Sequence, residues 1–119
     1  MFEIGDVYLM DLGKDRGNEE AGVMPCVVVS GELHNTVNRT VIAIPITKSL
    51  SKAYWHEHTV IDVSFVYGEC ISVEKRVAMC EHIREVDKKF VKGSVLGFVD
   101  DEDLLAIKEN LQLNVIPIK

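Results

Sequence analysis

The alternation of short β-prone segments with turn residues most constrains the fold of this chain. Five segments are rich in β-branched residues or alternate apolar with polar residues, and glycine or asparagine stands in the breaks between them. Strands of this length and spacing predict a small, strongly curved β-barrel or half-barrel. The segment 26–29 is apolar on both sides, which is typical of a central strand. The five predicted strands are 7–12, 26–30, 40–46, 59–63 and 76–83.

The apolar residues change their period near the C-terminus. Acidic residues at 100–103 supply an N-cap and a negative first turn, which the helix dipole favours. Leu104, Ile107 and Leu111 then fall on one stripe at helical spacing. We therefore expect a single domain over residues 1–119, mostly β, with a C-terminal helix packed on the sheet. The apolar tail 115–118 is expected to cover a barrel edge or a partner.

The charge of the chain is acidic overall but unevenly placed. The formal net charge of −6 argues against a surface that binds polyanions everywhere. Residues 100–109 hold five acidic residues and one lysine, whereas residues 75–92 hold six basic and three acidic residues. One face of the molecule could therefore meet phosphate.

Composition also bears on location. No uncharged run is long enough to span a bilayer, and the first residues lack the pattern of a signal peptide. The three cysteines form no CxxC pair, and Cys26 and Cys80 lie in apolar runs, so both are expected to be buried, reduced thiols. The expected location is the cytoplasm, with no membrane partner.

Several ordered motifs carry a resemblance to a known family. They run through the chain in a fixed order with characteristic spacing, and together they span nearly all of it. They are Gly5-Asp6-Val7-Tyr8, Gly17 with Glu19, Gly22 and Pro25 before the run 27–29, Ile44-Pro45-Ile46-Thr47, and Glu81 with Ile83, Arg84 and Asp87. In these respects the chain resembles the MazF/PemK family, the mRNA interferase toxins of type II toxin–antitoxin systems.

The resemblance implies a fold, an activity and partners. The fold would be a small SH3-like barrel of the PemK/MazF type, similar to CcdB, with a C-terminal helix, usually as a homodimer. The activity would be cleavage of single-stranded RNA without a metal or other cofactor, through attack by the RNA 2′-hydroxyl. An antitoxin peptide would block the site. By motif, Thr47 matches the active-site threonine, Glu19 and Gly22 lie in the RNA-binding first loop, and Glu81 and Arg84 line the groove.

One departure from the family pattern affects the predicted activity. The family places an arginine before the proline of the first loop, and Met24 stands there in this chain. Loss of one such donor to a phosphate costs on the order of 3–4 kcal/mol of transition-state stabilisation. An alternative is therefore a weak or inactive binding module for nucleic acid, RNA or DNA, or for an antitoxin-like peptide. A structural dimer that touches no nucleic acid is a third possibility.

Other residues could replace the missing cation. If 76–83 is a strand, His82 and Arg84 point to the same face, and a histidine can act as acid or base near neutral pH. We therefore include His82 with Thr47, Glu81 and Arg84 among the candidate catalytic residues. Arg16 in the first loop could also swing toward a phosphate.

The segment 48–56 joins two predicted strands and combines cations with aromatic residues. Lys48, Lys52 and Trp55 could neutralise RNA backbone and stack an unpaired base, or the segment could simply fold onto the barrel. His56 and His58 would share one face of an extended segment, but no second ligand pair completes a tetrahedral site. We expect no metal there.

Overall fold

The computed structural model describes residues 1–14 and 21–117. Its seven strands are β1 (Asp6–Asp11), β2 (Val23–Val28), β3 (Thr40–Thr47), β4 (His58–Tyr67), β5 (Cys70–Met79), β6 (Arg84–Asp87) and β7 (Val91–Val99). The structure has two α-helices, α1 (Glu32–Val37) and α2 (Asp101–Asn110). It also has the short helical turns η1 (Leu50–Tyr54), η2 (Cys80–His82), η3 (Lys88–Phe90) and η4 (Leu111–Val115).

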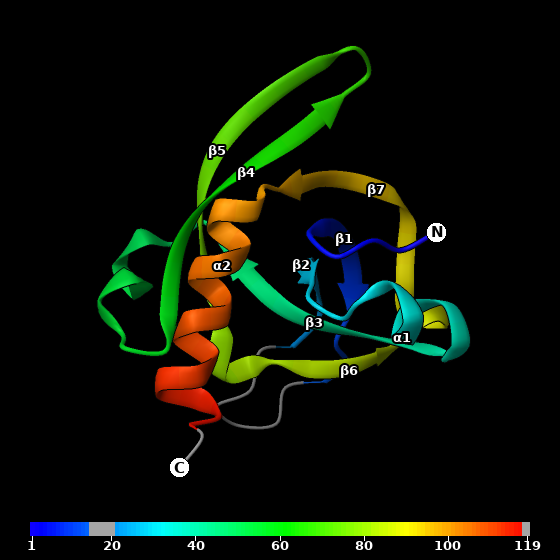
Figure 1. Cartoon of the computed structure of the whole chain (residues 1–119). Helices are drawn as coiled ribbons and strands as arrows, with labels where there is room; N and C mark the ends of the chain where they lie inside the picture. Colours follow the sequence, from blue (N-terminus) through cyan, green and yellow to red (C-terminus); the bar gives the residue numbers. More distant parts are fainter. Residues whose placement is uncertain (15–20, 118–119) are drawn as a thin grey trace.

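The strands close into a barrel (Figure 1). The order around it is β1, β2, β3, β5, β4 and β7, with β7 returning to β1, and every pairing is antiparallel. After the turn η2, β6 continues along the other half of β3. β2 therefore has a neighbour on each side, and Cys26, Val27 and Val28 are fully buried. This confirms that the apolar segment is a central strand.

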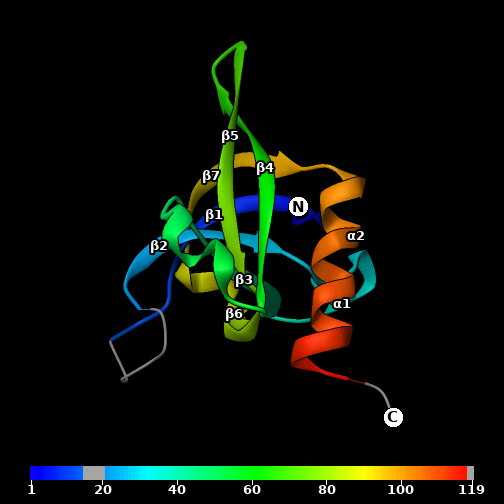
Figure 2. The same ribbon diagram turned by 90° about the vertical axis from the view of Figure 1, so that its left-hand side faces the viewer.

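β4 and β5 form one long hairpin whose tip stands clear of the barrel (Figures 1 and 2). The register runs from His58 opposite Met79 to Tyr67 opposite Cys70, around a turn that contains Gly68. The predicted strands 59–63 and 76–83 are wrong in extent, because the hairpin pairs its own backbone groups where no core lies beneath it. Residues 80–82, predicted as strand, form the 3₁₀ turn η2.

The sequence analysis also missed β7 and α1, and it placed β2 three residues too late. β7 contains two glycines, which are disfavoured in strands. Gly97 has a specific role there, because a Cβ at this position would lie 2.2 Å from the carbonyl oxygen of Ser64 on β4. A close approach of two strands, which no local pattern reveals, selects this glycine.

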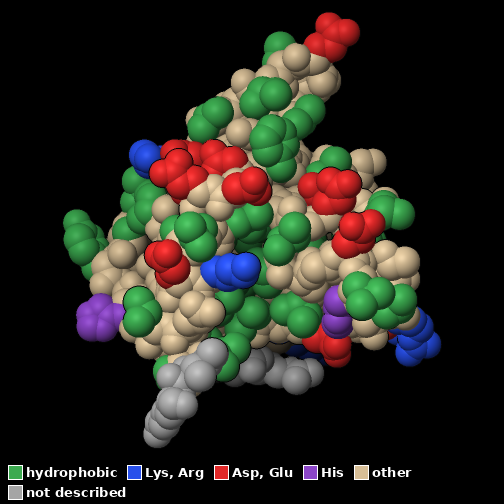
Figure 3. Space-filling model, viewed as in Figure 1, with side chains coloured by type: hydrophobic (Ala, Val, Ile, Leu, Met, Phe, Trp, Pro, Cys, Tyr) green, Lys and Arg blue, Asp and Glu red, His purple; other side chains and the backbone are tan. Residues whose placement is uncertain are grey.

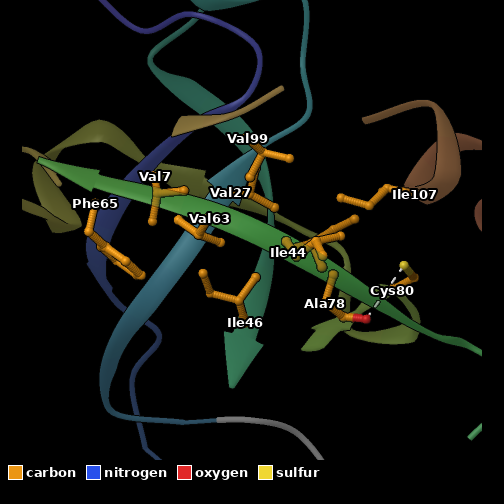
Figure 4. Packing of buried hydrophobic residues seen from close by; sticks show 11 residues of the cluster. Val7, Val27, Ile44, Ile46, Val63, Phe65, Ala78, Cys80, Val99 and Ile107 are labelled. Atoms are coloured by element: carbon orange, nitrogen blue, oxygen red, sulfur yellow. Dashed lines mark hydrogen bonds between the residues drawn. The ribbon is translucent and has the colours of Figure 1, made fainter. Parts of the chain in front are cut away.

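The C-terminal helix forms as predicted. The Asp100 side chain accepts a hydrogen bond from the Asp103 N–H and caps α2. Ile107 is buried in the main core, and Leu104 and Leu111 pack against that core. Figure 4 shows residues of this core from several strands, with Ile107 at one side of the cluster. A second apolar cluster, which includes Met10 and Cys26, lies on the other face of β1 and β2.

α2 also protects the outer edge of β4. Asp103 Oδ2 accepts the backbone N–H of Asp62 at 3.0 Å, and Asn110 Nδ2 donates to the carbonyl of His58 and to Thr59 Oγ1. Beyond the helix, Val115 packs on the main core while Ile116 is exposed. The predicted covering of the barrel by the tail therefore extends to Val115, and residue 118 lies outside the described residues.

The cysteines behave as predicted where the prediction was specific. Cys26 and Cys80 are buried free thiols, and Cys70 is exposed near the hairpin tip. Burial raises the pKa of Cys26 to about 12 and that of Cys80 to about 11. Among the described residues, no helix has the length and apolar character needed to cross a bilayer.

Candidate functional site

Thr47 lies at the end of β3, on a sheet face that it shares with position 24. Thr47 pairs with Val77 of β5. The pairing of β2 with β3 ends at Cys26 opposite Pro45, and continuing this register by two residues brings Met24 opposite Thr47. Opposite residues of an antiparallel pair project from the same face. Thr47 Oγ1 accepts the Ser49 N–H at 3.2 Å, which leaves the hydroxyl proton available to a ligand.

Arg84 supplies a cation on the same sheet face. It begins β6 opposite Ala43, and Ala43 projects to the same side of β3 as Thr47 because the two are four residues apart. Burial raises the pKa of the Cys26 thiol, and the positive charge of Arg84 partly offsets this effect. Arg84 also lines a hollow of about 510 Å³ together with Asp11 and Leu12 at the end of β1.

Glu81 is held by a buried histidine. His58 Nε2 lies 2.7 Å from Glu81 Oε2, and His58 Nδ1 lies 2.8 Å from the carbonyl oxygen of Lys52. Because a carbonyl only accepts, Nδ1 carries a proton, and a second proton must lie between Nε2 and Oε2. The His58 side chain is 1% exposed, so the pair is shielded from water on the histidine side. Glu81 Oε1 is buried and has no hydrogen-bond partner among the described residues.

The segment between β3 and β4 presents the predicted aromatic residues. Tyr54 is 88% exposed, and Trp55 is 55% exposed with its ring stacked on His58 at a centroid distance of 5.0 Å. The indole therefore has one face packed and part of its surface open. The ring of Trp55 and the backbone carbonyl of Lys52 contact His58, whereas no hydrogen bond or ring contact joins Lys48 to the His58–Glu81 pair among the described residues.

The first loop is described only at its base. Gly22 accepts the Leu12 N–H and donates its own N–H to the Gly13 carbonyl, so the two arms are joined there. Gly22 has a φ of +79° and Gly13 a φ of +86°, which favours glycine at both positions. Arg16 and Glu19 lie outside the described residues.

The reasoning that joined His82 to Arg84 is wrong. His82 lies within the 3₁₀ turn η2 and Arg84 begins β6, so strand alternation does not relate them. His82 instead lies beside Glu81, with Nε2 3.9 Å from Oε2, and both line a hollow of about 210 Å³ with Ile83 and Arg84. Within residues 1–14 and 21–117, no group of three histidine, cysteine or acidic side chains is arranged to hold a metal ion.

Sequence reasoning missed the role of His58. It was weighed only as a metal ligand with His56, because the extent of the hairpin was not predicted. A buried position for His58 and a long β4–β5 register together bring it to Glu81 across 23 residues.

The charge of the α2 face differs from that of the site. Figure 3 shows acidic side chains gathered on the face that carries α2, where residues 100–103 are all acidic. That face repels phosphate. Neither Arg84, which begins β6, nor Lys52, which lies in the turn η1 between β3 and β4, belongs to α2.

The chain matches a known protein family over most of its length. Residues 3–115 match the family model for the PemK-like, MazF-like toxin of type II toxin–antitoxin systems. The chain is 31% identical over 116 residues to the endoribonuclease MazF of Staphylococcus epidermidis, covering 97% of this chain and 92% of that protein. It is 32% identical over 111 residues to the endoribonuclease EndoA of Bacillus subtilis, covering 93% and 91% of the two chains.

Solved structures agree in fold. A mycobacterial endoribonuclease determined with its cognate antitoxin superposes with a TM-score of 0.71 at 18% identity, over 100% of this chain and 99% of that one. MazF of Deinococcus radiodurans superposes with a TM-score of 0.66 at 20% identity, over 92% of each chain. These likenesses confirm the predicted SH3-like, CcdB-like barrel with a C-terminal helix.

Proposed function

Because the chain belongs to the PemK-like, MazF-like toxin family of type II toxin–antitoxin systems, we propose that it is a toxin that cleaves single-stranded RNA. The observation that carries this proposal is the shared sheet face of Thr47 and Arg84, next to the His58–Glu81 pair. A hydroxyl donor, a cation and a held carboxylate are the groups that phosphodiester cleavage requires.

The proposed reaction uses the 2′-hydroxyl of the RNA as nucleophile and no metal ion. The 2′-oxygen bonds to phosphorus as its proton passes to a base, and the bond to the 5′-oxygen breaks as that oxygen gains a proton. The products are a cyclic phosphate and a 5′-hydroxyl. Thr47 donates a hydrogen bond to a phosphate oxygen and Arg84 offsets its charge, while Glu81 and His82 are the candidates for proton transfer.

Substrate and partners follow from the same surface. We propose that Trp55 stacks an unpaired base, that Lys48 and Lys52 neutralise backbone phosphates, and that the first loop with Arg16, Glu19 and Gly22 closes over the strand. An antitoxin peptide would compete for this surface in the cytoplasm. The one-sided edge of β6 and the tail after η4 would join two copies into a homodimer.

A second candidate function rests on Met24. A thioether opposite Thr47 can neither carry charge nor donate a hydrogen bond. If Arg84 does not replace the missing cation, the same surface is a binding module for nucleic acid or an antitoxin-like peptide, with cleavage weak or lost.

Purified protein and a defined single-stranded RNA test the proposal. We expect fragments that end in cyclic phosphate, and we expect Thr47→Val to abolish them, because valine keeps the shape and removes the hydroxyl. Thr36→Val, on the exposed surface of α1, is the matched control. RNA that binds but stays intact, together with normal growth of a host at high expression, would reject the nuclease and support the binding module.

A further inference from the structure

The outer edge of the β4–β5 hairpin is the largest unassigned feature of the barrel. β3 pairs with β5 only at Val77 and Ala78, so residues 70–76 have a neighbouring strand on one side alone in the described chain. β4 differs, since β7 and the side chains of α2 cover its outer edge over much of its length. In Figures 1 and 2 this half of the hairpin extends beyond the other strands.

The backbone groups that face outward from β5 can be assigned. The Asp62 N–H bonds Asp103 on α2, so Asp62 points away from β5, and this orientation repeats at every second residue. Lys75 is opposite Asp62, and Val73 and Ile71 follow it at the same period. The N–H and C=O of Ile71 and Val73 therefore point away from the hairpin.

The same two residues carry exposed apolar side chains. Ile71 is 59% exposed and Val73 is 63% exposed, and both share a sheet face with Val66 of β4. Phe98 of β7 lies opposite Ser64 on that face and is also exposed. Natural sheets usually protect an edge of this kind with charge, proline or a bulge. Ile71 and Val73 offer none of these.

We propose that the outer edge of β5 pairs with the same edge of a second copy of this chain. In an antiparallel pairing centred on Ser72, Ile71 of each copy faces Val73 of the other, and the outward backbone groups of both residues are satisfied in pairs. Two β-branched side chains then oppose each other, Ser72 opposes Ser72, and Cys70 opposes Glu74, so no like charges meet.

Charge matching favours a second copy over an unrelated peptide. The charged side chains nearest the edge are already balanced within the chain, since Glu74 pairs with Arg76 and Lys75 pairs with Asp62. In the pairing centred on Ser72, Lys75 of each copy lies opposite Glu69 of the other, so the charges at the ends of the contact are complementary. The contact involves few residues, so the association is weak and depends on concentration. It is independent of β6, and it does not depend on nuclease activity.

Disulfide trapping tests the register of this pairing. A Cys70→Ser background removes the exposed thiol, and Ser72→Cys then places two thiols across the two-fold axis, where Cα atoms of a non-hydrogen-bonded pair lie about 4.5 Å apart. Ile71→Cys is the matched control, because its two thiols would lie on neighbouring rather than opposite positions, beyond disulfide reach. Under oxidised glutathione, we expect the Ser72→Cys protein to form covalent dimers at least tenfold faster.

A backbone variant completes the test. Val73→Pro removes the outward N–H without touching the β4 ladder, and it should reduce trapping through residue 72 to the control rate. If circular dichroism shows that this variant is unfolded, Val73→Lys, which removes the apolar pair, should slow trapping instead. Equal rates of disulfide formation for Ser72→Cys and Ile71→Cys would overturn the proposal. So would a rate through residue 72 that neither Val73 variant changes. If no covalent dimer forms through residue 72 but an antitoxin peptide binds only when Val73 is present, the edge is a binding site for that peptide instead.

Discussion

Replacing Met24 by arginine is expected to raise the rate of RNA cleavage at least tenfold. The β2–β3 register, continued by one alternate pair beyond Cys26 opposite Pro45, brings position 24 opposite Thr47. A guanidinium there would reach the phosphate that we propose the Thr47 hydroxyl contacts. A preorganised charged donor at such a position contributes about 3–4 kcal/mol, which is a hundred- to a thousandfold in rate. A tenfold gain corresponds to about 1.4 kcal/mol and allows for a half-exposed side chain that remains partly hydrated.

The substitution should fold. Met24 is half-buried against the second apolar cluster rather than enclosed in it, and the aliphatic part of an arginine can cover the same surface while its charge stays in water. We expect a loss of about 1 kcal/mol in the free energy of unfolding, measured by urea denaturation. A loss of several kcal/mol would show that the charge is buried without a partner.

Single-turnover cleavage of a defined RNA is the assay, with Met24→Gln as the control that adds a polar group without charge. A double-mutant cycle with Arg84→Gln shows whether Arg84 already supplies the cation. If it does, Arg84→Gln should slow the native chain more than it slows the Met24→Arg protein. A folded Met24→Arg protein that binds RNA but cleaves no faster than native would refute the reasoning and favour the binding module.

Three further outcomes can be checked. Gly97→Ala should cost about 2–4 kcal/mol of unfolding free energy because its Cβ meets a strand backbone, whereas Gly31→Ala, with open space around it, should be nearly neutral in the same melts. Burial raises the pKa of Cys26 and of Cys80 in the folded protein, so the unfolded thiols ionise first and the free energy of unfolding should fall as the pH rises above about 9. The free energy of unfolding of a Cys26→Ala protein should fall less steeply with pH. A free energy of unfolding that stays constant up to about pH 11 would contradict this. Sedimentation at micromolar concentration should show a dimer of twice 13.3 kDa, and a monomer alone would exclude the proposed homodimer.

The parts of the fold that follow local patterns were predictable. The central strand and α2 carry their own signals, namely a run of buried residues and a capped apolar stripe, and both are present. The hairpin and β7 were predicted poorly because long-range pairing, rather than burial, decides their extent. Gly97 illustrates this, since the need for glycine there is visible only once β7 is paired with β4.

The arrangement of the candidate site residues could not be predicted from the sequence, and their roles stay predictions. Thr47, Glu81 and Arg84 were identified by motif, and the register explains why Thr47 and Arg84 share a face. The hydrogen bond between His58 and Glu81 could not be foreseen, because it joins the first residue of β4 to a turn beyond β5. The turn η2 also invalidated the alternation argument for His82.

The closed base of the first loop has an evolutionary consequence. Leu12 and Gly13 each form a backbone hydrogen bond with Gly22, so the two arms of the loop are joined at its base. The entropic cost of lengthening a loop anchored in this way grows only slowly with its length. Under the proposed function, descendants of this chain could therefore change the length of the loop, and with it the choice of RNA sequence or antitoxin, while its two arms stay joined at the same base.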